Sequence, residues 1–247
     1  MRVSMPNILA YSAGTYRKNI KLIMLFSLAF VLAFLIPIFA AFPTYNDMGA
    51  ILLRTSSVFI NLNLLNTAVI VIAVFFSLLF LSFAMVAINV ICKHGRTRTK
   101  IGHEVLEGLE AHTSKVFVVL LFETLTLFAV DLLFYGTGYS AIAMSVSALV
   151  VSPIFFYAPS SIVIDDNRVP NAMRSSIRFF KGKPGYFVLW LAVAVALLSV
   201  FDYLFIFLGG TTVSRYVMLI FSSLFILPFL VVLQTESYMN RFKLLKR

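Results

Sequence analysis

The sequence predicts an all-α fold, a polytopic membrane protein with six transmembrane helices and amphipathic elbow helices on the cytoplasmic side. Of its 247 residues, 61% are hydrophobic and only 12% are charged, about half the charged fraction of a typical soluble domain. Apolar stretches of about 20 residues, enough to cross a bilayer at 1.5 Å per residue, recur along the chain. Because no other segment is long enough to build a core, we predict that residues 1–247 form a single integral membrane domain.

Six apolar stretches have the length and composition of spanning helices. They are Leu22–Phe42, Thr67–Cys92, Val116–Tyr135, Tyr139–Ile164, Tyr186–Leu208 and Tyr216–Thr235. A seventh, Ala50–Leu65, is shorter and carries Arg54, Asn61 and Asn63. We therefore expect it to lie at the outer interface instead of crossing.

The basic residues predict the orientation of the chain. The net charge is +10, and eighteen of the 20 Lys and Arg residues lie in the terminal segments and in the second and fourth connections. Only Arg54 and Arg215 lie on the other side. Because positive charge stays inside, we predict a multi-pass protein of the cell membrane with both termini cytoplasmic. Such residues fit contacts to membrane lipid or a protein partner, and we expect no nucleic acid. The candidate contacts are Arg17, Lys18, Arg174, Arg178 and Lys181.

Three segments on the basic side have the pattern of amphipathic helices, at residues 5–19, 100–114 and 170–181. In the third, Met173, Ile177 and Phe180 share one face and the basic residues another. Aligning the first segment with the third also matches Ser12 to Ser176. We therefore predict that each forms an elbow helix near the inner membrane face and leads into a span. The hypothesis is a threefold repeat of helical hairpins, with units 1–92, 93–164 and 165–247.

Three acids lie within the apolar stretches. Glu123 comes eight residues after Lys115, about 12 Å along a helix, while Asp131 and Asp202 lie toward the outer ends of spans three and five. A charge at the bilayer centre costs about 3 kcal/mol or more, so such residues usually face an interior. They either hold helices together or line a pathway. For Glu123 we predict a hydrogen bond, inside the bundle, to a hydroxyl or carbonyl of another span.

Prolines and glycines predict where the helices bend and turn. Pro153, Pro159 and Pro228 lie in spans four and six, where a missing N–H breaks a helical hydrogen bond. Gly136-Thr137-Gly138 and Gly209-Gly210 fall between spans on the outer side and suit tight turns.

The residue types that enzymes and metal sites need are sparse. His94, His103 and His112 lack metal-ligand spacing, and the lone Cys92 cannot form an internal disulfide. The stretch from Gly136 to Ala141 matches a dinucleotide fingerprint in letters, but it follows a membrane span and not a strand. We therefore predict no metal, no cofactor and no enzymatic activity.

One stretch resembles a known family pattern. Pro159, Ile162 and Val163 end a span, Asp165-Asp166 form an acidic turn, and Ala172, Met173 and Ser176 follow in an elbow helix. This order is similar to the membrane domain attached to some glycerophosphoryl diester phosphodiesterases and to related uncharacterised six-helix proteins of bacteria and archaea. The resemblance covers about thirty residues and implies the fold. The chain has no phosphodiesterase domain, so that activity is not implied.

Two classes of function fit these features. The first is a non-enzymatic scaffold or the membrane component of a larger complex. The second is a transporter or permease subunit for a small molecule or ion, using Glu123, Asp131 and Asp202. A lipid-modifying enzyme comes third, because no nucleophile or metal set is evident.

Overall fold

The computed structural model describes residues 5–39, 64–97, 101–134, 137 and 139–241, and within them it is helical without any strand. The all-α prediction is therefore confirmed. The helices are α1 (Met5–Lys18), α2 (Ile20–Phe39), α3 (Leu64–Thr97), α4 (Ile101–Leu133), α5 (Ser140–Phe155), α6 (Ala158–Asp165), α7 (Val169–Gly182), α8 (Pro184–Phe221), the π-helix η1 (Ser222–Ile226) and α9 (Leu227–Met239).

The predicted spans correspond to these helices. Five helical stretches of the described chain are long and apolar enough to cross a membrane, and a sixth follows if the bent pair Asn7–Lys18 and Ile20–Ile36 counts as one span. The fold is thus that of a polytopic membrane protein. The predicted interfacial stretch Ala50–Leu65 lies, apart from Leu64 and Leu65, outside the described residues.

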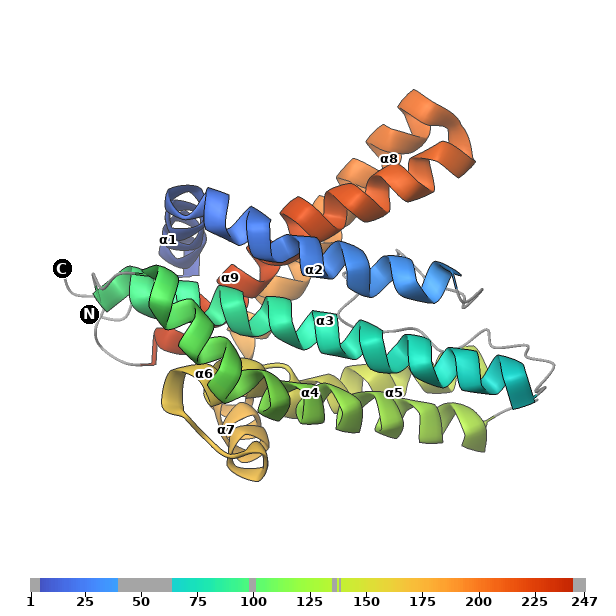
Figure 1. The fold of residues 1–247 in the computed structure, drawn as a ribbon, viewed down its shortest axis with the longest axis horizontal. Helices are drawn as coiled ribbons and strands as arrows, with labels where there is room; N and C mark the ends of the chain where they lie inside the picture. The colour runs from blue at the N-terminus through green and yellow to red at the C-terminus, as the bar shows by residue number, and fades with distance from the viewer. Residues whose placement is uncertain (1–4, 40–63, 98–100, 135–136, 138, 242–247) are drawn as a thin grey trace.

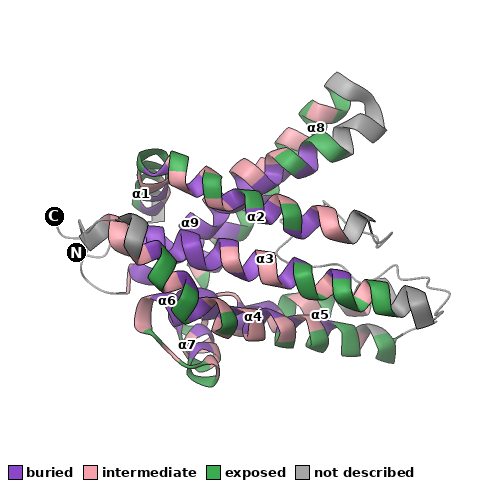
Figure 2. Cartoon of the chain, viewed as in Figure 1, coloured by how far each residue is buried: buried purple, intermediate pink, exposed green. Residues whose placement is uncertain are grey.

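Helices α2, α3, α4 and α5 lie side by side, while α8 diverges from them (Figure 1). The chain reverses its direction within α8. This reversal brings Phe201 and Phe221 together, with their ring centroids 4.7 Å apart. The helix continues across Gly209 and Gly210, where the sequence predicts a tight turn between two spans. Every residue of helix α9 except the half-buried Phe229 is buried, and the helix occupies the interior of the bundle (Figure 2).

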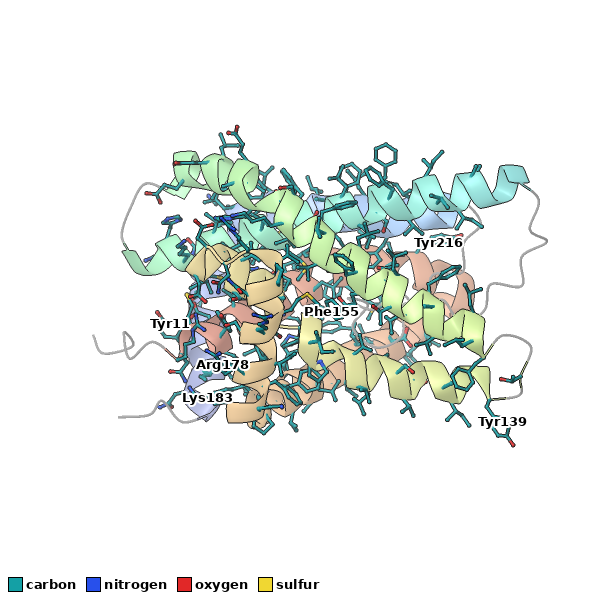
Figure 3. All side chains as sticks on the ribbon, turned by 90° about the horizontal axis from the view of Figure 1, so that it is seen from below. Tyr11, Tyr139, Phe155, Arg178, Lys183 and Tyr216 are labelled. Carbon is teal, nitrogen blue, oxygen red and sulfur yellow. The ribbon has the colours of Figure 1, made fainter. Side chains whose placement is uncertain are left out.

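Two of the three predicted elbow helices are present. Helix α1 meets α2 at 90°, and α7 runs crosswise to the spans (Figure 3). The prediction of a separate second elbow is wrong, because residues 101–133 form one continuous helix. Its N-terminal part instead packs against α3, and no proline or extended residue interrupts it. The third elbow differs from α4 in this respect, because it is separated from the following span. Lys183, with φ −147°, ends α7 and precedes Pro184, where α8 begins. The equivalence of units 1–92, 93–164 and 165–247 stays a prediction.

Each elbow segment packs against a span of another unit. Helix α1 contacts α9, α7 contacts α5 and α6, and the start of α4 contacts α3. The last contact is close enough that a Cβ on Gly108 would lie 2.6 Å from Val90 Cγ2. All three contacts lie toward the same end of the bundle. We call it the basic end, after the exposed Arg17, Lys18, Arg174, Arg178 and Lys181.

Candidate functional site: a buried polar cluster at the basic end

The last turns of α9 carry polar side chains into the interior of the basic end. Gln234, Thr235, Glu236 and Ser237 are each at most 1% exposed. A polar group buried without a partner is costly, so the contacts of these residues decide how the helices assemble. The sequence marks this segment only as a polar run, Gln234–Ser237, that follows the apolar Leu227–Leu233.

These side chains bond to three other parts of the bundle. Thr235 Oγ1 lies 2.8 Å from Asn89 Oδ1 on α3, and Thr15 on α1 donates to Glu236 Oε1 at 3.0 Å. The Gln234 amide donates to the carbonyl of Phe156, which lies between α5 and α6. Helix α9 is therefore the shared partner of α1, α3 and the broken fourth span.

Asp165, at the end of α6, is the centre of a second network. Its Oδ2 accepts from the Tyr238 hydroxyl at 2.7 Å and from Asn167 at 3.4 Å, and it forms an ion pair with Arg241. The Arg241 guanidinium also lies 4.1 Å from the centroid of the Tyr238 ring and donates to Ser175 Oγ at 3.3 Å. One carboxylate thus joins the end of α6 to Tyr238 on α9 and to Arg241, which in turn reaches Ser175 on α7.

The neighbouring Asp166 ends α6 and turns the chain toward α7. Its φ of 50° is left-handed, a conformation that Asp adopts more readily than most residues. Lys115 on α4 donates to Asp166 Oδ1 at 2.8 Å, and this hydrogen bond and charge lower the pKa of the exposed carboxyl below its usual value. Lys93 on α3 donates to the Val163 carbonyl at 2.7 Å and so satisfies a group at the C-terminus of α6.

Span four is broken between α5 and α6, and α7 seals the break. The Ser176 hydroxyl accepts from the Tyr157 amide at 3.0 Å and donates to the Pro153 carbonyl at 2.8 Å. Those two backbone groups are four residues apart, the pair that an unbroken helix would join directly. Insertion of a side chain into this ladder is a known cause of a helix kink.

Aromatic rings fill the space between α7, α8 and α9. Tyr157 contacts Phe179 at 4.6 Å between centroids and Tyr238 at 6.0 Å. Phe179 also stacks with Tyr186 at 6.2 Å, and Lys183 Nζ lies 5.5 Å from the Tyr186 ring. The hydroxyl of Tyr157 is buried without a hydrogen-bond partner among the described residues. The cluster packs the elbow against the bundle.

The structure separates the three intramembrane acids that the sequence singled out. Glu123 is 8% exposed, so it points into the bundle as predicted. The predicted hydrogen bond from another span is not found among the described residues. Asp202 is half-buried on α8, which lies apart from α4 (Figure 1). The side chain of Asp131, on α4, lies outside the described residues.

The five predicted lipid or partner contacts are all exposed. Arg17 and Lys18 end α1, while Arg174, Arg178 and Lys181 lie along α7. None of them forms an ion pair with an acid in the part of the chain that the structure describes. In Figure 3, Tyr11 on α1 and Arg178 lie at one end of the molecule, and Tyr139 and Tyr216 lie at the other.

Nothing in the described residues groups three or more His, Cys, Asp or Glu side chains in a way that could hold a metal ion. Two histidines instead lie near an acid, with His94 Nε2 at 3.2 Å from Glu104 and His112 Nδ1 at 3.7 Å from Asp166.

No family model, curated protein or solved structure matches the chain. The resemblance to the membrane domain attached to phosphodiesterases therefore stays a prediction. Its residues nevertheless bond between helices in the structure, since Asp165 and Asp166 join the end of α6 to neighbouring helices and Ser176 joins α7 to the break between α5 and α6. Sequence reasoning missed this role, and it missed Tyr238 and Arg241 altogether.

Proposed function

We propose that the chain is a non-enzymatic membrane scaffold or the membrane component of a larger complex, located in the cell membrane with both termini cytoplasmic. The observation that carries this proposal is the use of the buried polar groups at the basic end. Asp165, Glu236 and Thr235 bond to side chains of other helices. Such bonds fix helix positions, because breaking them leaves polar groups buried and unpaired.

A fixed basic end suits a protein that presents surfaces to others. The exposed residues there include a row of basic side chains, whereas much of the remaining surface is apolar, including Leu132, Val188 and Tyr203. The contacts of His94 with Glu104 and of His112 with Asp166 also support a non-enzymatic role.

The orientation can be tested with an impermeant thiol reagent. Tyr11 is 40% exposed at the basic end and Tyr139 is 72% exposed at the opposite end, and the native Cys92 is buried. Tyr139→Cys is expected to label in intact cells, and Tyr11→Cys only after the membrane is permeabilised. Labelling of Tyr11→Cys in intact cells would reverse the proposed orientation.

The scaffold proposal predicts a stable assembly. After extraction from native membranes in mild detergent, the 27.7 kDa chain should migrate with a second protein at fixed stoichiometry. A chain that migrates alone, in detergents that preserve other membrane complexes, would contradict a scaffold.

A transporter is the second candidate, and the burial of Glu123 favours it. A buried carboxyl without a partner among the described residues suits a site that is filled only during transport. Glu123→Gln is then expected to abolish solute uptake into vesicles at unchanged protein abundance. Unchanged uptake, or none in the unaltered protein, would remove this candidate.

A further inference from the structure

Helix α7 exposes a row of cations that no acid of the described chain neutralises. Arg174, Arg178 and Lys181 are spaced by four and three residues, so they lie on one face of the helix. All three are exposed, and none forms an ion pair with a described residue. The sequence from Asn167 to Lys183 contains no acid at all.

The face of α7 opposite the row of cations is anchored to the bundle. Ala172, Ser176 and Phe179 on the opposite face are buried, and Ser176 bonds to the backbone of span four. Because the buried face is anchored, the helix backbone holds the three cations in one row, so no backbone ordering is needed when an anion binds.

An apolar stripe runs beside the cations. Met173, Ile177 and Phe180 each precede a cation by one residue, and all are only half-buried. A soluble acidic partner would gain little from this stripe, whereas a lipid offers acyl chains beside its phosphate. The helix also runs crosswise to the spans (Figure 3) and is followed directly by the apolar span Pro184–Phe207. That places α7 at the level where headgroups meet acyl chains.

We propose that the exposed face of α7 binds anionic phospholipid headgroups, with Arg174, Arg178 and Lys181 contacting the phosphates and Met173, Ile177 and Phe180 the acyl chains. The inference goes beyond the proposed function, because it holds for a scaffold and for a transporter alike. Lys183 is not part of the row, since its ammonium already lies near the rings of Phe179 and Tyr186.

The test measures the thermal unfolding of the purified full chain in an uncharged detergent. Trp190 is the only tryptophan, and its indole is buried with Nε1 2.8 Å from the Leu230 carbonyl, so its fluorescence reports the basic end. Dioctanoyl phosphatidylglycerol and dioctanoyl phosphatidylcholine are titrated separately. The anionic lipid is expected to raise the unfolding temperature at lower concentration than the zwitterionic lipid. Equal effects of the two lipids would overturn the proposal.

Matched variants locate the binding. Arg174→Gln/Arg178→Gln should weaken the apparent affinity for the anionic lipid by about 25-fold, roughly fivefold for each basic side chain near an anionic surface. Lys21→Gln/Arg168→Gln loses the same charge from exposed side chains outside the row and outside the candidate contacts, and it should bind nearly as the unaltered protein does. Equal weakening by both pairs would show that only net charge matters and would overturn the site.

A charge-preserving variant and a salt series complete the test. If the Gln pair fails to fold, Arg174→Lys/Arg178→Lys should keep the preference for the anionic lipid, because it keeps the charge. In the unaltered protein the preference should disappear in about 1 M NaCl, where screening acts within about 3 Å. A preference for the anionic lipid that survives this salt would contradict a headgroup site. So would inorganic phosphate alone raising the unfolding temperature as much as the anionic lipid does.

Discussion

The hydroxyl of Ser176 takes the place of the helical hydrogen bond that Tyr157 would otherwise make. It accepts the amide of Tyr157 at 3.0 Å and donates to the Pro153 carbonyl at 2.8 Å. A residue of the elbow helix α7 thereby completes the backbone of span four, which carries Pro153 and Pro159. The bend in the span and the position of the elbow are one structural unit.

Ser176→Ala should therefore destabilise the protein by about 2 kcal/mol, because it leaves a buried N–H and a buried carbonyl without a partner. Ser12→Ala is the matched control. Ser12 aligns with Ser176 and is equally buried, but its hydroxyl has no partner among the described residues. Its replacement should cost little or nothing. Unfolding in a mixed-micelle denaturant series measures both, and equal losses would contradict the inserted hydrogen bond.

Gly108→Ala is expected to loosen the contact between α3 and α4 at a cost of about 2 kcal/mol. The added Cβ would lie 2.6 Å from Cγ2 and 3.3 Å from Cγ1 of Val90, a side chain with little rotamer freedom. Gly14→Ala on α1 meets nothing within 4 Å and should instead stabilise its helix by about 1 kcal/mol. Val90→Ala should relieve the loss in the Gly108→Ala background. If Val90→Ala does not restore the stability lost in Gly108→Ala, the loss does not come from the contact with Val90.

Asp165 and Tyr238 should behave as a coupled pair. Tyr238→Phe removes the 2.7 Å hydrogen bond and should cost about 1 kcal/mol, while Asp165→Asn weakens the contact with Arg241 as well and should cost about 2 kcal/mol. Because the two losses share one bond, the double variant should lose less than their sum. Strict additivity in thermal unfolding would show that the network is not energetically connected.

The contact between Lys115 and Asp166 should make stability depend on pH on the acid side. The pKa of Asp166 is lowered in the folded state, so the contact stabilises the fold above the usual carboxyl pKa, about 3.9. That contribution is lost as the pH falls below this value through the folded pKa. Lys115→Gln should thus be less stable than the unaltered protein at pH 7, and the difference should shrink below about pH 4. A difference that is independent of pH would contradict the pairing.

The apolar framework could be predicted from the sequence, because spanning helices are set by the length of apolar runs. Thr67–Cys92 falls within α3, and Pro159 lies at the predicted break in span four. The candidate site could not be predicted in the same way. Asp165 and Arg241 are 76 residues apart, and no local pattern tells which acid meets which base. The continuity of α4 was also missed, since an amphipathic segment and a span have the same helical period.

The two aligned serines also show that the sequence does not predict the hydrogen-bond partners of a buried side chain. Ser12 and Ser176 occupy matching positions in their elbows and are both fully buried. Only Ser176 faces a broken helix, however, because only span four carries two prolines beside it. The bonding of a hydroxyl depends on the backbone it meets, and the sequence around the serine does not contain that information.

The enclosed position of α9 has a consequence for biosynthesis. Helix α9 leaves the ribosome after the helices that precede it in the chain, yet it supplies the partners of Thr15 on α1, Asn89 on α3 and the Phe156 carbonyl. Until it arrives, these groups lack their final partners, and Asn89 and the Phe156 carbonyl lie within spans, where water does not replace the missing bonds. The bundle can therefore reach its native packing only after α9 has been synthesised, and a truncated chain ending before Leu227 would be a substrate for membrane quality control.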